Sequence, residues 1–285
     1  MSNETDRTRE AAARRFASVL FVADHLEGVP YEDLRHAIAT HSFVCVRGLF
    51  EREAVRRTLD GIREHFRPKD DRRHNPLDSN AARSNFQKLQ IGANSGVNSR
   101  RTLGRFMRVL YNPIFADDVL GMRETFIKLA KFRNHLYRLP VDHAVTGTDD
   151  GFWTCSRLLQ YPTGGGFIVP HRDMYAQIAT TDAGLGYFQP LLLMTEKGRD
   201  FQQGGAYVDV GEERFYYEEF CQSGDVIVYD GRSVHGVSDI DPLSDLELVA
   251  FSGRVVALAS LFKLLNPDTN DYEEMGKRAR RLQAD

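Results

Sequence analysis

The chain has 285 residues, of which 42% are hydrophobic and 27% charged, and its formal net charge is −3. A chain of this length can bury a full hydrophobic core. The near balance of charge leaves no broad basic field or polyacidic tail, and no run of about 18 apolar residues is present, so we expect neither a nucleic-acid nor a membrane partner.

The N-terminal stretch and the cysteines both favour a cytoplasmic protein. The first residues mix arginines with acidic residues and lack the apolar segment of a signal peptide. The three cysteines, Cys45, Cys155 and Cys221, have no Cys-x-x-Cys spacing. We therefore expect free thiols in a reducing compartment.

Residues 1–150 are predicted to form a mainly helical support with a lid. Apolar residues recur at helical spacing from Val55 to Phe66, and a second helix is expected over 116–137. A β-rich run over 43–48 predicts one short strand in this half. The polar segment 69–101 is a long loop, and its part 85–101 is our candidate lid, with simple disorder as the alternative.

From residue 151 onward, short β-type runs alternate with turn signals. The runs occupy 158–161, 167–169, 187–194, 206–210, 225–229 and 246–262. Such a series predicts an antiparallel sandwich or barrel over 151–265, followed by a polar helix within 266–285. The predicted fold class is α+β, with residues 1–285 forming a single domain.

Three residues in the β-rich half have the types and spacing of a metal site. His171 and Asp173 lie two positions apart, so on one strand they point to the same face. The chain then has 61 residues in which to return with His235. Two imidazoles and one carboxylate form the facial triad of non-haem Fe(II) oxygenases, which leaves open positions for a 2-oxo acid and dioxygen. A His-x-Asp pair by itself is expected by chance. The residues around the pair therefore have to show whether it belongs to a metal site.

These surroundings resemble the core strands of the 2-oxoglutarate/Fe(II) dioxygenase superfamily. The resemblance rests on the segments Tyr161–Asp173 (YPTGGGFIVPHRD), 204–208 (GGAYV), 224–237 (GDVIVYDGRSVHGV) and 252–254 (SGR). The stretch 46–50 (VRGLF) is similar to the start of phytanoyl-CoA-dioxygenase-like members. The resemblance implies a double-stranded β-helix, or jelly roll, that binds Fe(II) and 2-oxoglutarate and reacts with dioxygen.

Arg254 is our candidate for binding the far carboxylate of 2-oxoglutarate. It lies in an apolar run, where a charge needs a buried partner, and a guanidinium can pair with a carboxylate through two parallel hydrogen bonds. Ser252, expected on the same strand face, and Gln160 are weaker candidates for the same contact. Tyr175 and Gln177 share the strand parity of Asp173, so they are expected either in the pocket or in the core.

The carboxylate of Asp173 bears on the reaction. Halogenating members of the superfamily lack this carboxylate, so the resemblance favours hydroxylation, or desaturation or ring closure by hydrogen abstraction. The polar lid candidate and the range of the superfamily suggest a small polar metabolite, such as an intermediate of secondary metabolism, as substrate.

Two other functions stay open. A cupin-type metalloenzyme without 2-oxoglutarate would not need Arg254, and a non-catalytic jelly-roll binding module would not need three intact ligands. The letters HRD at 171–173 also occur in protein kinases. A kinase would require Asn at Ile178, and Gln202 stands where the glycine of its DFG motif would follow Asp200-Phe201, so we exclude it.

Overall fold

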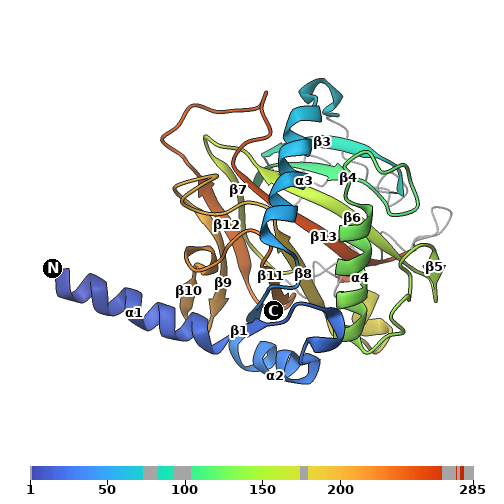
Figure 1. Ribbon diagram of the computed structural model, residues 1–285, viewed down its shortest axis with the longest axis horizontal. Helices are drawn as coiled ribbons and strands as arrows, with labels where there is room; N and C mark the ends of the chain where they lie inside the picture. Colours follow the sequence, from blue (N-terminus) through green and yellow to red (C-terminus); the bar gives the residue numbers. More distant parts are fainter. Residues whose placement is uncertain are drawn as a thin grey trace.

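The computed structural model describes residues 2–72, 83–92, 104–173 and 179–264, together with Glu274, Lys277 and Arg278. Figure 1 labels the main elements. The helices are α1 (Ser2–Ser18), α2 (Tyr31–His41), α3 (Arg52–His65) and α4 (Arg123–Tyr137), with short 3-10 turns η1 (Leu26–Gly28), η2 (Pro68–Asp70) and η4 (Tyr217–Glu219). The strands are β1 (Leu20–Val22), β2 (Phe43–Arg47), β3 (Phe86–Gly92), β4 (Arg105–Tyr111), β5 (Thr148–Asp149), β6 (Phe152–Tyr161), β7 (Gly166–His171), β8 (Phe188–Leu193), β9 (Gly205–Val210), β10 (Glu213–Phe215), β11 (Val226–Asp230), β12 (His235–Ile240) and β13 (Arg254–Lys263).

The strands β6 to β13 form a double-stranded β-helix. One four-stranded layer has the order β11-β8-β13-β6 and the other has the order β7-β12-β9-β10, and neighbours within each layer are antiparallel. The chain crosses between the layers at most of its connections, which is the winding of a jelly roll. Strand β4 pairs with both β6 and β7 and so joins the two layers along one side. The predicted fold class is confirmed.

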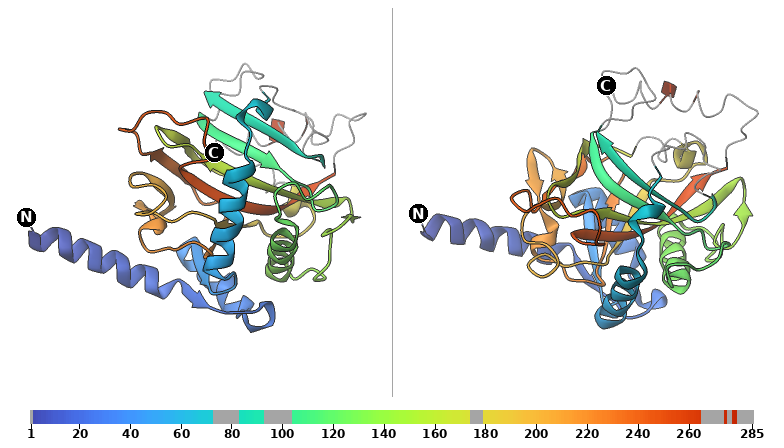
Figure 2. Two further views of the ribbon diagram at one scale, coloured as in Figure 1. Left: turned by 45° about the horizontal axis from the view of Figure 1, so that its top comes forward. Right: turned by 90° about the horizontal axis from the view of Figure 1, so that it is seen from above.

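Segments from the first half of the chain extend and cover the layer β11-β8-β13-β6. Strand β2 pairs with β11 at one edge, and the β3–β4 hairpin adds to β6 at the other. Helix α4 packs against β8 and β13, and α2 packs against β2 and β11. Helix α1 projects away from the body of the protein (Figure 2).

One hydrophobic core joins this support to the β-helix. It includes Leu59 of α3, Phe126 of α4, Val44 of β2 and Ala257 of β13, each 0% exposed. The division into a support over 1–150, a catalytic core over 151–265 and a terminal helix stays a prediction. None of the helices among the described residues has both the length and the apolar character needed to cross a bilayer.

The first half contains more strand than its sequence predicts. The strand over 43–48 is confirmed as β2, but β4 was not predicted and β3 lies where we expected a lid. Residues 93–101 of the lid, and all of the predicted C-terminal helix except three residues, lie outside the described residues. Charged residues within β3 and β4 explain the miss, because Lys88, Arg105 and Arg108 interrupt the apolar alternation by which a strand is recognised.

Helix α4 begins later than predicted. The carboxylate of Asp118 accepts hydrogen bonds from the backbone nitrogens of Met122 (2.9 Å) and Arg123 (3.2 Å). These bonds satisfy amide groups that have no partner at the start of a helix. The apolar residues before Met122 therefore lie in a loop, not in the helix.

We predict that Gly253→Ala destabilises the protein by about 2 kcal/mol or more. Gly253 has φ +78°, and a Cβ there would overlap the carbonyl oxygen of Tyr161 and lie 2.7 Å from the amide nitrogen of Thr163. The matched control is Gly61→Ala within α3, where a Cβ meets nothing within 4 Å. We expect this change to stabilise the protein by about 0.5–1 kcal/mol. Urea unfolding measures both effects, and equal stabilities would contradict the prediction.

Candidate metal centre

The structure brings His171, Asp173 and His235 together. His171 is the last residue of β7 and His235 is the first of β12, and the two lie directly opposite each other in the antiparallel register. Asp173 follows two residues after the end of β7. One ligand atom from each residue lies within 4.8 Å of the others. The Nε2 atoms of His171 and His235 each lie 3.6 Å from a different carboxylate oxygen of Asp173.

Backbone carbonyl groups orient both imidazoles. Nδ1 of His171 lies 2.9 Å from the carbonyl oxygen of Val169, and Nδ1 of His235 lies 3.0 Å from that of Ser233. Since a carbonyl oxygen only accepts, Nδ1 carries the proton, and the lone pair on Nε2 is directed toward Asp173. Burial, and to a lesser degree neighbouring His235, lowers the pKa of His171 to about 4. His171 is therefore neutral at pH 7, as a metal ligand must be.

Asp173 is held from the turn between β11 and β12. Its backbone nitrogen donates to the carbonyl oxygen of Gly231 (3.0 Å), and the hydroxyl of Tyr229 donates to its Oδ2 atom (3.3 Å). The three side chains thus offer two imidazole nitrogens and a carboxylate to a single shared space. This donor set fits Fe(II) and matches the facial triad.

A second group of potential ligands, Cys45, Cys221 and Asp225, lies elsewhere and fits a metal poorly. Arg47 donates to both carboxylate oxygens of Asp225, with the shortest contact at 2.7 Å. Burial raises the pKa of the Cys221 thiol well above its usual value, whereas a metal needs the thiolate. The three cysteines are free thiols, as predicted.

Arg254 lies in the interior, and its partner is an acidic residue that we did not predict. Arg254 is the first residue of β13, lies directly opposite Tyr161 of β6, and is 2% exposed. Its Nε donates to Glu218 Oε1 (2.7 Å), and its guanidinium lies 5.1 Å from the ring centroid of Tyr161. The other oxygen of Glu218 accepts from the backbone nitrogen of Ala206 (2.8 Å), so Glu218 itself is fixed.

Gln160 and Ser252, the weaker candidates for contact with the 2-oxoglutarate carboxylate, do not lie where we expected them. Gln160 neighbours Tyr161 on β6 and so points to the opposite face from Arg254; its side chain accepts from Arg108 and donates to the Ser252 carbonyl oxygen (2.8 Å). Ser252 precedes β13, so the expected shared strand face with Arg254 is wrong. Its buried hydroxyl has no partner among the described residues. Tyr175 and Gln177 lie outside the described residues.

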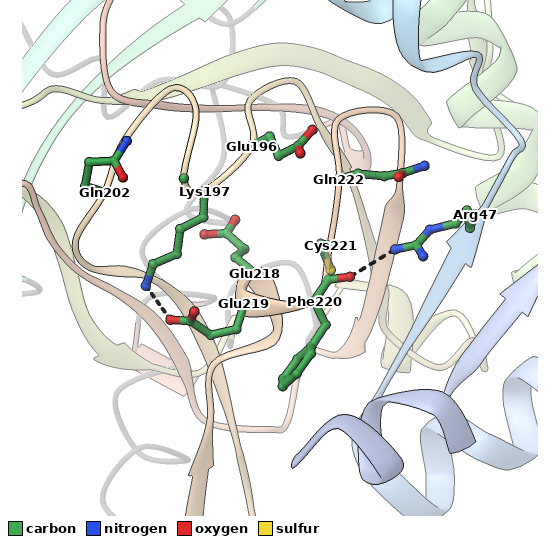
Figure 3. Close-up of a pocket in the computed structure, with 10 residues that line it drawn as sticks. Arg47, Glu196, Lys197, Gln202, Glu218, Glu219, Phe220, Cys221 and Gln222 are labelled. Atoms are coloured by element: carbon green, nitrogen blue, oxygen red, sulfur yellow. Dashed lines mark hydrogen bonds and ion pairs between the residues drawn. The ribbon is translucent and has the colours of Figure 1, made fainter. Parts of the chain in front are cut away.

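A surface hollow of about 430 Å³ is lined by Glu218 and by residues around it, among them Lys197, Glu219 and Arg47 (Figure 3). Each of its charged lining residues already has a partner. Lys197 pairs with Glu219 inside the hollow, while Arg47, Glu196 and Glu218 pair with Asp225, Arg52 and Arg254, which do not line it. None of the three triad residues lines it. Because its charges are already balanced, we assign it no part in the chemistry.

We predict that His235→Ala abolishes stoichiometric binding of Fe(II). The change removes one of three ligands and leaves His171 and Asp173, which are too few to hold the ion tightly. Anaerobic iron titration of the purified protein measures the stoichiometry. The control is His36→Ala, an exposed position on α2, which should bind iron as the wild type does. Full iron occupancy in the His235 variant would count against this centre.

We also predict that Tyr229→Phe weakens Fe(II) binding by about 10-fold. The change removes only the hydroxyl that donates to Asp173, while the ring remains packed 4.2 Å from the His235 ring centroid. The dissociation constant for iron, measured by competition with a chelator, tests this prediction. An unchanged constant would mean that Tyr229 does not orient the carboxylate.

No protein-family model matches the chain, and no curated protein matches it. Solved structures with a similar arrangement include an oxidoreductase of the 2OG-Fe(II) oxygenase family from Burkholderia pseudomallei (15% identity, 86% of this chain and 96% of that one, TM-score 0.45). A prolyl hydroxylase from Trichoplax adhaerens aligns at 11% identity over 90% and 93% of the two chains, with a TM-score of 0.47.

A third is the non-heme alpha ketoglutarate dependent epimerase SnoN from nogalamycin biosynthesis (13% identity, 82% and 80% of the two chains, TM-score 0.47). That this chain belongs to the phytanoyl-CoA-dioxygenase-like subgroup stays a prediction.

Proposed function

We propose that this protein is an Fe(II)- and 2-oxoglutarate-dependent oxygenase that hydroxylates a small polar metabolite or, by hydrogen abstraction, desaturates or cyclises it. The observation that carries the proposal is the convergence of His171, Asp173 and His235 across β7 and β12, with both Nε2 atoms directed to one space. Three protein ligands leave room on the ion for a chelating cosubstrate and dioxygen.

In this proposal His171, Asp173 and His235 would hold the iron. Bound Fe(II) with 2-oxoglutarate would supply the redox chemistry that activates dioxygen for attack on an unreactive C–H bond. The protein contributes geometry: the carbonyl groups of Val169 and Ser233 keep the imidazoles in the ligating tautomer, and Tyr229 orients the carboxylate. The presence of Asp173 favours oxygenation over halogenation.

Arg254 is proposed to bind the far carboxylate of 2-oxoglutarate. Glu218 engages its Nε, which leaves the two Nη groups to make a charge-assisted contact. Glu218 then acts as a positioning residue that fixes the plane of the guanidinium. Tyr161, opposite Arg254, lies beside the same space.

Anaerobic addition of Fe(II) and 2-oxoglutarate should give a weak visible charge-transfer band, and air should then convert 2-oxoglutarate to succinate. Absence of both the band and succinate would overturn the proposal. Iron binding without either signal would instead support a cupin-type metalloenzyme that uses no 2-oxoglutarate.

We predict that Arg254→Met raises the 2-oxoglutarate concentration at half-maximal band intensity by about 10- to 100-fold, because hydrogen bonds to charged groups contribute about 1.5–3 kcal/mol. Iron stoichiometry should not change, since Arg254 is not a ligand. The control Arg214→Met removes an exposed arginine paired with Asp209 and should leave the titration unchanged. A wild-type titration curve for the Arg254 variant would remove Arg254 from the cosubstrate site.

A further inference from the structure

Three cations line one face of the β3–β4–β6 part of the sheet: Lys88, Arg105 and Arg157, here called the cation cluster. Lys88 lies opposite Val109, and Arg157 lies opposite Tyr111. Alternate residues of a strand share a face, so Arg105, Val109 and Tyr111 of β4 point the same way. All three cations therefore project from the same face, and this is also the face of Tyr161, four residues after Arg157 on β6.

This face leads to the metal centre through a chain of contacts. Arg157 Nη1 donates to Ser260 Oγ (3.2 Å), and that hydroxyl donates to Gln189 Oε1 (2.9 Å). Gln189 is directly opposite Tyr229, whose hydroxyl donates to Asp173.

Arg105 approaches the centre from another side. It lies opposite Ile168 on β7, the strand that ends at His171. The cation cluster thus borders the space into which the triad points.

The two arginines of the cluster lack acidic partners among the described residues. Arg157 donates to the carbonyl oxygen of Cys155 and to Ser260, and the Nε of Arg105 is buried without a hydrogen-bond partner in the described part of the chain.

The more deeply buried arginines are differently placed. Arg56, Arg108 and Arg254 pair with Asp200, Asp71 and Glu218. Fully buried Arg133 has each of its guanidinium nitrogens bonded to a neutral oxygen, whereas Nε of Arg105 has no partner among the described residues. An uncompensated buried charge is costly. Arg105 and Arg157 are half-buried beside the metal centre without an acidic partner among the described residues, which favours a ligand that is negatively charged.

Lys88 adds to this positive field. It is 5% exposed, and its ammonium lies 5.5 Å from the ring centroid of Tyr111. Burial, followed by the neighbouring Arg105 and Arg157, lowers the pKa of Lys88 to about 8. The lysine is therefore still mainly protonated at pH 7. A bound anion would offset the repulsion between Lys88 and the two neighbouring arginines.

The charges of the loaded site leave a positive excess. Asp173 offsets one charge of Fe(II), and Glu218 balances Arg254. The dianion of 2-oxoglutarate offsets the remaining charge of Fe(II) and the charge of one of the two arginines of the cluster, so one positive charge remains. From this arrangement we infer that the substrate carries an anionic group, a carboxylate or a phosphate, which binds to Arg105 and Arg157 of the cation cluster. The inference rests on the proposed function and narrows its polar metabolite to an anionic one.

The test measures anion binding by calorimetry on the metal-free, full-length protein, with inorganic phosphate and malonate as separate probes. At least one probe should bind the wild type, and its dissociation constant should rise 10-fold or more in Arg105→Met and in Arg157→Met. Arg105→Lys, which keeps the charge, should retain most of the binding and controls for loss of fold. Arg214→Met, on the exposed surface, should match the wild type. A response to phosphate alone assigns a phosphate group, and a response to malonate alone assigns a carboxylate.

A second measurement separates the substrate from the cosubstrate. The charge-transfer titration with Fe(II) and 2-oxoglutarate should keep its midpoint within twofold in both Met variants. A 10-fold rise in that midpoint would mean that the cluster binds 2-oxoglutarate, and equal anion binding in wild type and variants would show that it binds no anion; either result overturns the inference. If anion binding depends on the cluster but no band forms in the wild type, the anion site stands and the proposed oxygenase function fails.

Discussion

The antiparallel register between β7 and β12 is the constraint on which the metal centre depends. It sets His171 opposite His235, although 63 residues separate them in the chain. A slip by one residue would turn one imidazole to the other face of its strand, because side chains alternate. The register is maintained by pairing of β12 with β9 on its other side and by the apolar contacts of the core. The centre is thus a property of the whole β-helix, and no single loop builds it.

Several arginines lie on the strands of the sheet, and the partners of each help to separate structural from functional groups. Arg108 and Arg254 have carboxylate partners and neighbouring aromatic rings, so their burial is compensated within the protein. Arg105 and Arg157 have no acidic partner within the described residues. This contrast between the fully buried, paired arginines and the half-buried Arg105 and Arg157 is more informative than the total charge of −3, which gives no hint of a local positive field.

The sequence predicted the fold class and the convergence of the three triad residues, because glycine-bounded β-runs and a His-x-Asp pair followed by a distant histidine are local patterns. It did not predict Glu218, since nothing in the order of residues indicates which acid reaches Arg254 across the sheet. Nor did it predict that Gln160 points away from Arg254, which depends on the register of β6 with β13. The β4 strand was missed because Arg105 and Arg108 interrupt its apolar pattern, and only tertiary packing shows what their charges face.

The turn between β11 and β12 has a consequence for metal-free protein. Gly231 and Tyr229 hold Asp173, and Ser233 holds the ring of His235, so two of the three triad residues are anchored to five consecutive positions of the chain. Any local opening of this turn displaces both of them together. Ion binding should therefore slow amide hydrogen exchange at this corner more than in the paired strands around it, since local opening and ion release become one cooperative event.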